Sequence, residues 1–385
     1  MRDVYVTGAS MTKFGKRADM GLVELATEAG LGALNDAQNE EAKVDAVYVG
    51  NAASGQLCGM ENLGPIVAER LGLLPCEAQR IETTTASGSC AIKQAYRDIA
   101  GGFLDRVLVV GAEKMTHLPT EDATKVLASS MTHPTGETVH GASMPALAAM
   151  FTRKYLDKFG LSTRYLALVA VKNHSNALKN PYAHLQKKIT LEDALASPIV
   201  ADPLRVTDCA PMTDGAAAIL LQSKPPAESK APVKVRGIEQ STDRQMFYQR
   251  AEEFSIGALK DASTKAFNVA GLKPNEIDVA ELHDAFTVLE MVESEDIGFF
   301  SKGEAARALE NGVTQIDGAL PINTGGGLKA RGHPLGATGV AQIVELTWQL
   351  RGEANERQVH DAKTALACNF GGLGNTVVVT ILERS

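Results

Sequence analysis

The chain has 385 residues, of which 44% are hydrophobic and 22% charged, and its formal net charge is −8. This composition is typical of a globular protein that buries a large core, and the negative charge argues against nucleic acid as a partner, because phosphate binding needs a basic face. The apolar runs are too short to cross a membrane, and residues 1–8 predict a strand rather than a signal peptide, so we expect a cytoplasmic protein without a membrane partner.

The cysteines predict neither a disulfide framework nor a metal site. They stand singly at positions 58, 76, 90, 209 and 368, an odd number without a Cys-x-x-Cys pair. Scattered cysteines of this kind are typical of reduced thiols. We therefore expect no bound metal.

Two parts of the chain repeat one plan of elements. Residues 25–52 predict an alanine-rich helix followed by a strand, and residues 258–286 predict the same pair. Residues 85–88 and residues 333–336 each open a helix with apolar residues at four-residue spacing. The repeat indicates an α/β protein of two similar halves, related by a pseudo-twofold axis, whose helix starts meet at the centre.

The segment 151–190 is basic although the protein is acidic. It holds eight Lys or Arg residues, Lys187 and Lys188 among them, against Asp157 as its single acid. Such a patch suits a small polyphosphate ligand, while the alternative is a pair of helices whose charges are simply solvated. Farther along, residues 223–232 are rich in proline and charge, which predicts a linker between the halves.

Three segments place polar side chains at strand ends or in loops. Residues 277–286 predict a strand that runs out into His283, and residues 365–380 predict two strands whose glycine turn presents Cys368. Residues 323–339 contain six glycines and carry His333 before a helix, where helix-start amides and a ring N–H can face a developing negative charge. These segments predict one converging site.

On these motifs the chain resembles the thiolase superfamily over nearly its whole length. His333 lies in the family's GHP motif, Cys368 in its C-terminal Cys-x-x-Gly-Gly turn, and residues 283–286 form the HDAF version of the family's NEAF position. That version is similar to thiolases of the archaeal and sterol-carrier-protein type, which are acetyl-CoA C-acyltransferases. The resemblance implies an α/β fold of five layers, αβαβα, in two pseudo-twofold-related halves plus a loop domain.

The resemblance also implies domain boundaries. We place the N-terminal half at residues 1–120 and the loop domain, with returning strands of that half, at residues 121–222. The linker then spans residues 223–235 and the C-terminal half residues 236–385. In the family the loop domain holds the adenosine phosphates of coenzyme A, so the resemblance favours ligand binding for the basic segment.

One residue of the family pattern is missing: Thr85 occupies the position at which thiolases carry the nucleophilic cysteine. A thiol of pKa about 8.5 becomes a thiolate readily at a helix start, whereas a hydroxyl needs a dedicated adjacent base. Cys90 lies roughly 7 Å farther along the same predicted helix and is better explained as a small buried side chain. The sequence is consistent with a natural threonine and with an engineered one.

Carried over by position, the family mechanism assigns a role to each site residue. Residue 85 takes the acyl group, and backbone amides near residues 85 and 372 hold its oxyanion. His333 activates the nucleophile and helps to stabilise an enolate, to which His283 donates directly or through a water. Cys368 shuttles the α-proton. The expected contacts with coenzyme A are Gly372, Lys187, Lys188 and, in a supporting role, Asn323.

Coenzyme A or an acyl-CoA is therefore the expected substrate, and the resemblance implies no permanently bound cofactor. It also implies a homodimer or tetramer and, as in archaeal relatives, partnership with a small OB-fold, zinc-ribbon protein and a condensing synthase.

Three functions are consistent with the sequence. The first is a C-acyltransferase that forms or cleaves acetoacetyl-CoA or another 3-oxoacyl-CoA, impaired or altered by Thr85. The second is a C–C lyase of retro-aldol or decarboxylating type, which needs no acyl-enzyme. The third is a non-catalytic acyl-CoA-binding scaffold subunit. The two histidines and Cys368 argue against the third, because a binding subunit has no use for them.

Overall fold

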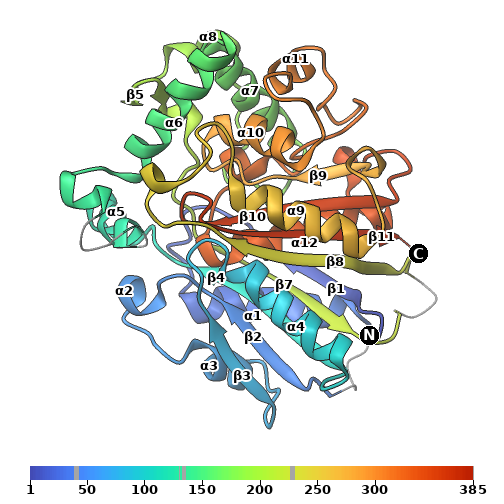
Figure 1. Cartoon of the computed structure of the whole chain (residues 1–385). Helices are drawn as coiled ribbons and strands as arrows, with labels where there is room; N and C mark the ends of the chain where they lie inside the picture. Colours follow the sequence, from blue (N-terminus) through green and yellow to red (C-terminus); the bar gives the residue numbers. More distant parts are fainter. Residues whose placement is uncertain (39–42, 130, 132–135, 226–229, 385) are drawn as a thin grey trace.

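A mixed sheet of nine strands runs through the protein, with the strand order β3-β2-β4-β7-β1-β8-β11-β10-β9 (Figure 1). The computed structural model describes residues 1–38, 43–129, 131, 136–225 and 230–384. The N-terminal half of the sheet contains β1 (Tyr5–Met11), β2 (Ala46–Gly50), β3 (Glu77–Ile81), β4 (Arg106–Glu113) and β7 (Gly215–Gln222). The C-terminal half contains β8 (Val233–Thr242), β9 (Val279–Glu281), β10 (Thr364–Gly371) and β11 (Thr376–Arg384).

The two halves of the sheet repeat one pattern of pairing. Strand β2 is parallel to β4, which is antiparallel to β7, which is antiparallel to β1. Strands β9, β10, β11 and β8 repeat these relations in the same order. The halves join where β1 pairs with β8, at Tyr5↔Lys234 and Val6↔Val233. Helix α1 (Leu22–Asp36) precedes β2 as α9 (Gly257–Ala270) precedes β9, so the predicted duplication is confirmed.

Helices and sheet form five layers. Helices α4 (Ser87–Gly101) and α12 (Thr338–Arg351) lie between the two halves of the sheet and share one core with inward side chains of both. Helices α1 and α3 (Leu63–Arg70) cover the outer face of the N-terminal half. Helices α9 and α10 (Thr287–Ile297) cover the outer face of the C-terminal half. The predicted thiolase-like αβαβα fold is therefore confirmed.

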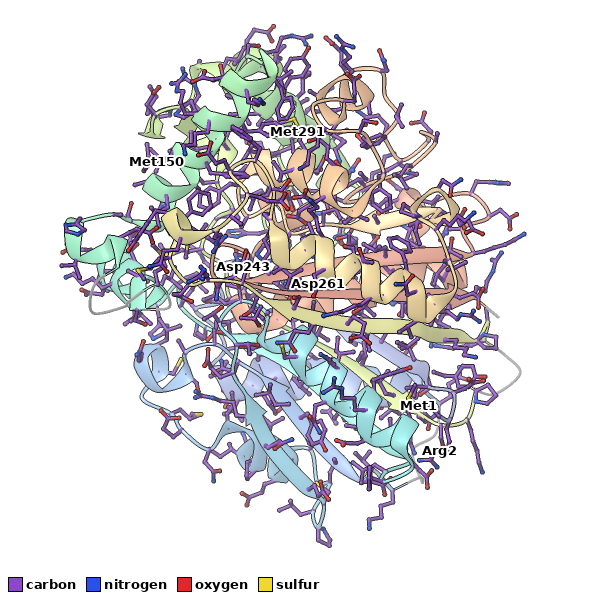
Figure 2. All side chains as sticks on the ribbon, in the orientation of Figure 1. Met1, Arg2, Met150, Asp243, Asp261 and Met291 are labelled. Atoms are coloured by element: carbon purple, nitrogen blue, oxygen red, sulfur yellow. The ribbon has the colours of Figure 1, made fainter. Side chains whose placement is uncertain are left out.

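The chain between β4 and β7 folds mainly above the C-terminal half (Figure 1). Its helices α6 (Met144–Phe159) and α7 (Arg164–Leu178) contribute side chains to the core of α9 and α10. Met291 of α10 is 2% exposed in that core, whereas Met150 of α6 is 59% exposed; both residues are labelled in Figure 2. Its elements are α5 (Thr120–Ser129), α6 (Met144–Phe159), α7 (Arg164–Leu178), α8 (Leu191–Ala196), β5 (Ile199–Ala201) and β6 (Leu204–Arg205). The remaining α-helices in the described residues are α2 (Ser54–Cys58) and α11 (Ala305–Glu310).

The predicted linker is shorter than expected at its C-terminal end. Strand β8 begins at Val233, so residues 233–235 pair with neighbouring strands instead of linking the halves. Residues 226–229 of that linker lie outside the described residues. The other domain boundaries stay a prediction. Within the described chain, no helix is long and apolar enough to cross a membrane.

The starts of α4 and α12 approach each other closely because glycines stand at the contact. A Cβ added to Gly88 would lie 2.6 Å from the carbonyl oxygen of Gly336, and one added to Gly336 would lie 2.5 Å from the carbonyl oxygen of Gly50. Both distances are far below van der Waals contact. Any side chain at these positions would therefore separate the two halves at their centre.

We predict that Gly336→Ala lowers the free energy of unfolding by about 3 kcal/mol, because the added methyl group has to displace backbone rather than a flexible side chain. Urea denaturation followed by circular dichroism measures the effect. Gly271→Ala is the matched control, since a Cβ there meets nothing within 4 Å and costs only its left-handed backbone, φ +69°, about 1 kcal/mol. Equal losses in both variants would contradict the steric account.

Candidate active site

A cavity of about 560 Å³ is lined by segments from both halves of the chain. Thr84 and Thr85, just before α4, face it from the N-terminal half, and His283 and His333 face it from the C-terminal half. Cys209 also lines it. Its apolar wall consists of Val126, Leu127, Met144, Met212, Phe286, Leu289, Leu335 and Leu373. The structure thus brings together three of the four residues predicted to be catalytic.

The hydroxyl of Thr85 donates its hydrogen bond to the backbone carbonyl of Phe370 in β10. Neighbouring Thr84, held at φ +52°, accepts a hydrogen bond from the N–H of Gly372 at 2.8 Å. The Thr85 proton is therefore directed at a carbonyl and not at a histidine. A hydroxyl that lacks an adjacent base is a weak nucleophile.

His283 presents a hydrogen-bond donor to the cavity. Its Nδ1 accepts from the side-chain amide of Asn369 at 3.1 Å and from the backbone N–H of Phe370 at 3.3 Å. Because a backbone N–H can only donate, Nδ1 carries the lone pair of the neutral ring, and the proton is on Nε2.

His333 has the opposite arrangement. Its Nδ1 lies 2.7 Å from Thr338 Oγ1, and that hydroxyl donates its proton to the carbonyl of Pro334 at 2.9 Å. Thr338 Oγ1 therefore accepts from His333 Nδ1–H, and the lone pair is on Nε2. His333 can act as a base where His283 can act as a donor.

The two rings pack edge to face, with centroids 5.1 Å apart. Burial, the neighbouring His333 and Arg331 hold the pKa of His283 well below its usual range. Burial and Arg331 lower the pKa of His333 to about 3. Both rings are therefore neutral at pH 7, and the opposite roles of their nitrogens persist across the physiological range.

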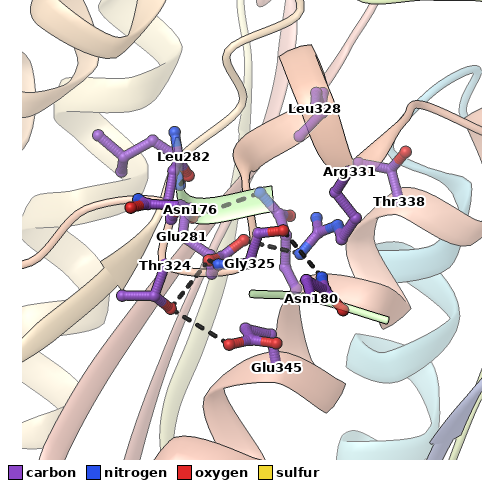
Figure 3. A network of polar contacts seen from close by, with 12 residues as sticks. Asn176, Asn180, Glu281, Leu282, Thr324, Gly325, Leu328, Arg331, Thr338 and Glu345 are labelled. Atoms are coloured by element: carbon purple, nitrogen blue, oxygen red, sulfur yellow. Dashed lines mark hydrogen bonds and ion pairs between the residues drawn. The ribbon is translucent and has the colours of Figure 1, made fainter. Parts of the chain in front are cut away.

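Buried carboxylates fix the loop that carries His333. Glu281 accepts the N–H of Gly325 at 3.2 Å and pairs with the Nη1 of fully buried Arg331 at 2.8 Å, a network drawn in Figure 3. Asp284 accepts the N–H of Leu328 at 2.6 Å and of Lys329 at 3.3 Å. The Asp284 carboxylate thus accepts backbone N–H groups of the one-turn π-helix Gly327–Arg331. This turn brings His333 to the start of α12.

Glu113 ties the same loop to the N-terminal half. Its carboxylate accepts the backbone N–H of Ala52 at 2.9 Å and of Gly336 at 3.0 Å, as well as the side-chain amide of Asn51 at 2.9 Å. Burial raises the pKa of Glu113 to about 7 even though several N–H groups oppose the shift. One carboxylate thus bridges the end of β4 and the helix start beside His333.

Cys368 faces away from the cavity. It is fully buried and does not line the cavity, and burial and Glu293 raise the pKa of its thiol well above the usual range. Because side chains alternate along β10, the next residue, Asn369, points to the other side and bonds to His283 from behind the cavity wall. The structure does not bring Cys368 to the position that a proton shuttle needs. The period-2 alternation was the signal that identifies Asn369 instead.

Asn323 does not line the cavity but stabilises the segments behind it. It is fully buried at φ +58°. Its side-chain oxygen accepts the N–H of Leu282 at 2.8 Å, and its amide donates to Glu290 at 2.8 Å. Asn323 therefore fixes the segment that ends in His283. Gly372 does line the cavity, at φ +60°, but Thr84 takes its N–H.

Much of the predicted basic patch is neutralised by acids distant in sequence. Lys172 is buried in an ion pair with Glu290 at 2.8 Å, and Arg164 pairs with Glu310 at 2.6 Å. Lys187 and Lys188 are exposed and do not line the cavity. Cys90 is buried in α4 outside the cavity wall. In the part of the chain that the structure describes, no three His, Cys, Asp or Glu side chains are grouped to hold a metal ion.

Two family descriptions match nearly the entire chain. Residues 4–225 match "Thiolase, N-terminal domain" and residues 240–384 match "Thiolase C-terminal domain-like". The chain belongs to the thiolase family. The acetyl-CoA acetyltransferase of Methanothermobacter thermautotrophicus is 42% identical over 386 residues, with both chains fully covered. These matches make the chain an enzyme of the acyltransferase class.

More distant relatives share the fold. Human sterol carrier protein 2 is 36% identical over 404 residues, which cover 100% of this chain and 72% of that protein. The structure of the Ltp2-ChsH2(DUF35) aldolase superposes with a TM-score of 0.81 at 24% identity, over 99% of this chain and 98% of that chain. At that identity the likeness shows the thiolase fold alone.

We predict that His333 makes the protein less stable in acid. The pKa of His333 falls from an ordinary value of 6.5 to about 3 in the folded protein, so between these values the unfolded state binds a proton that the folded state does not. The contribution of neutral His333 to the free energy of unfolding is therefore fully present above pH 6.5, and it is lost progressively as the pH falls toward 3. From pH 7 to pH 5 the native chain should lose about 1–2 kcal/mol more than His333→Gln in urea denaturation. Parallel losses in the two proteins would contradict a His333 that stays neutral in the folded state.

Proposed function

We propose that this thiolase-family enzyme acts on acyl-CoA thioesters and forms or cleaves the carbon–carbon bond next to the thioester carbonyl. The leading substrate is acetoacetyl-CoA or another 3-oxoacyl-CoA, in a Claisen-type C-acyltransfer. One observation carries the proposal: two neutral histidines share a cavity, and one offers a donor while the other offers a lone pair. Family membership and acetyltransferase relatives support it.

The pair is suited to an enolate. When the bond at the α-carbon breaks, negative charge collects on the thioester oxygen, and a fixed N–H such as Nε2–H of His283 stabilises it. His333 Nε2 is the base that takes a proton from a thiol entering the cavity. Thr85 occupies the acyl-accepting position, but its hydroxyl is bonded to Phe370. Acyl transfer is therefore the impaired half-reaction.

The remaining parts of coenzyme A are proposed to lie outside the cavity. Lys187 and Lys188 are exposed, and neither has an ion-pair partner among the described residues, so both are available to phosphates. No resident cofactor is part of the proposal. Assembly as a homodimer or tetramer, partnership with an OB-fold zinc-ribbon protein and a condensing synthase, and a cytoplasmic location stay predictions.

A retro-aldol or decarboxylating lyase is the second candidate, and Thr85 favours it. Such a reaction needs the enolate-stabilising pair but no acyl-enzyme, and a hydroxyl directed at a carbonyl cannot readily form one. A non-catalytic scaffold is disfavoured, because holding two histidines in neutral form at a cavity serves chemistry rather than binding.

We predict that Thr85→Cys raises acetoacetyl-CoA thiolysis by at least about a thousandfold, since removal of a catalytic nucleophile usually costs that much or more. Steady-state assay of acetoacetyl-CoA loss measures the rate, and peptide mass spectrometry locates the acetyl group on residue 85. Thr85→Ser is the matched control and should gain nothing. Cys90→Ala in the Thr85→Cys background should change little.

Two outcomes would overturn parts of this account. Acetylation of Cys90 in the unaltered protein would show that another thiol is the nucleophile. No gain from Thr85→Cys, together with cleavage of a 3-hydroxyacyl-CoA by the unaltered protein, would favour the lyase.

We predict that the unaltered protein exchanges the methyl protons of acetyl-CoA with deuterated water. Loss of one preorganised group typically costs about a hundredfold, so His333→Ala and His283→Ala should each slow exchange by at least that factor. Proton NMR of acetyl-CoA follows the exchange. His360→Ala, an exposed histidine, is the control. Exchange that is insensitive to both cavity histidines would contradict the enolate site.

A further inference from the structure

Cys209 places a thiol in the cavity. All five cysteines lie within the described residues and are free, and Cys209 is the one that lines the same cavity as Thr85, His283 and His333. It immediately precedes the loop that supplies Ala210 and Met212 to the wall. The cavity therefore lacks a thiol at position 85 but contains one elsewhere.

The backbone of Cys209 is fixed to both histidine-bearing segments. Cys209 forms an antiparallel bridge with Phe286, and the N–H of Ala210 donates to the carbonyl of Ala285 at 2.9 Å. Residues directly opposite in such a pair have Cβ atoms about 4.5–5.5 Å apart. On the other side, Lys329 Nζ donates to the carbonyl of Cys209 at 2.9 Å. The thiol is thus held beside the segment of His283 and the loop of His333.

The Cys209 thiol has no hydrogen bond to any described residue. Its neighbour Asp208 is already engaged by Thr287 Oγ1 at 3.1 Å and by the N–H of Arg205 at 2.9 Å. Burial raises the pKa of Cys209 to about 12, so the group is a neutral S–H at pH 7. A neutral thiol is a poor nucleophile but remains a far stronger acid than a carbon next to a thioester.

We propose that Cys209 is a catalytic residue that exchanges a proton with the α-carbon of the bound acyl-CoA. This inference rests on the proposed enolate chemistry. In the cleavage direction the broken C–C bond leaves its electron pair in an enolate, whose oxygen is held by Nε2–H of His283. The S–H bond of Cys209 then breaks as the new C–H bond forms. The thiolate recovers a proton from protonated His333, which had taken it from the attacking thiol, so nothing is oxidised or reduced.

The sequence around His283 makes this thiol the natural candidate. In HDAF the third position is Ala285, whose side chain cannot carry a proton, and the carbonyl of Ala285 is bonded to the residue after Cys209. Cys368, the thiol predicted for the task, faces the opposite side of β10. Of the five cysteines, all of them described, Cys209 is therefore the one whose thiol the fold places in the wall of the cavity.

The test measures deuterium exchange of acetyl-CoA methyl protons and acetyl-CoA binding side by side in Cys209→Ser and Cys209→Ala. Serine keeps the shape but is a much weaker acid, so both variants should slow exchange by about a hundredfold with the dissociation constant changed less than about threefold. Cys76→Ser, a cysteine outside the cavity wall, should exchange at the native rate. If the Cys209 thiol served only for packing, replacing it by alanine or serine would not slow exchange while leaving the dissociation constant unchanged.

A second measurement keeps the inference independent of folding. Because the raised pKa of Cys209 leaves little thiolate, methyl methanethiosulfonate should label Cys209 of the native protein slowly at neutral pH and faster as the pH rises. Saturating acetyl-CoA should protect Cys209 while Cys76 stays labelled, as mapped by peptide mass spectrometry. Native-rate exchange in Cys209→Ala, or labelling that acetyl-CoA does not reduce, would overturn the role of Cys209 alone. Absence of exchange from the unaltered protein would overturn the proposed enolate function as well.

Discussion

The close contact between the starts of α4 and α12 is the constraint on which the site depends. Gly88 and Gly336 leave no room for a side chain between the two helix starts, and Glu113 bonds the loop after β2 to the N–H of Gly336. Residues far apart in the sequence meet as a result. Thr85 lies just before the start of α4 and His333 just before the start of α12. The cavity that both residues line therefore forms only when the two halves are assembled.

Buried charge then determines what the histidines can do. The Glu281–Arg331 and Glu345–Arg357 pairs are almost completely buried, and removal of one partner of such a pair typically costs about 3–5 kcal/mol. They stabilise the glycine-rich loop and place the positive charge of Arg331 near both rings. Burial and that charge keep the rings neutral. The hydrogen bonds from Phe370 and to Thr338 then assign one ring as donor and the other as acceptor.

The sequence predicted those features that have a local or periodic signature. The alanine-spaced helices, the repeated helix–strand plan and the GHP and HDAF segments lie as expected, because each depends on residues adjacent in the chain. Features that depend on contacts between residues distant in sequence were not predictable in this way. Lys172 and Arg164 belong to a basic segment of the sequence, but in the fold they form ion pairs with Glu290 and Glu310.

Other differences come from backbone geometry. Whether residue 368 or 369 points toward His283 depends on the register of β10, and a difference of one residue reverses the face. The position of Cys209 follows from its pairing with Phe286, which no motif in the sequence records. Asn323 has the turn conformation expected of asparagine, but its bonds to Leu282 and Glu290 are known only from the fold.

The central claim is that a thioester binds with its carbonyl oxygen at the donor histidine and its α-carbon within reach of the cavity bases. A crystal structure of the unaltered protein with acetyl-CoA tests it most directly. We expect the thioester oxygen within hydrogen-bond distance of His283 Nε2, the methyl carbon between His333 and Cys209, and no acyl group on Thr85. A thioester bound outside the cavity, or an acyl group covalently attached to Thr85, would contradict the account.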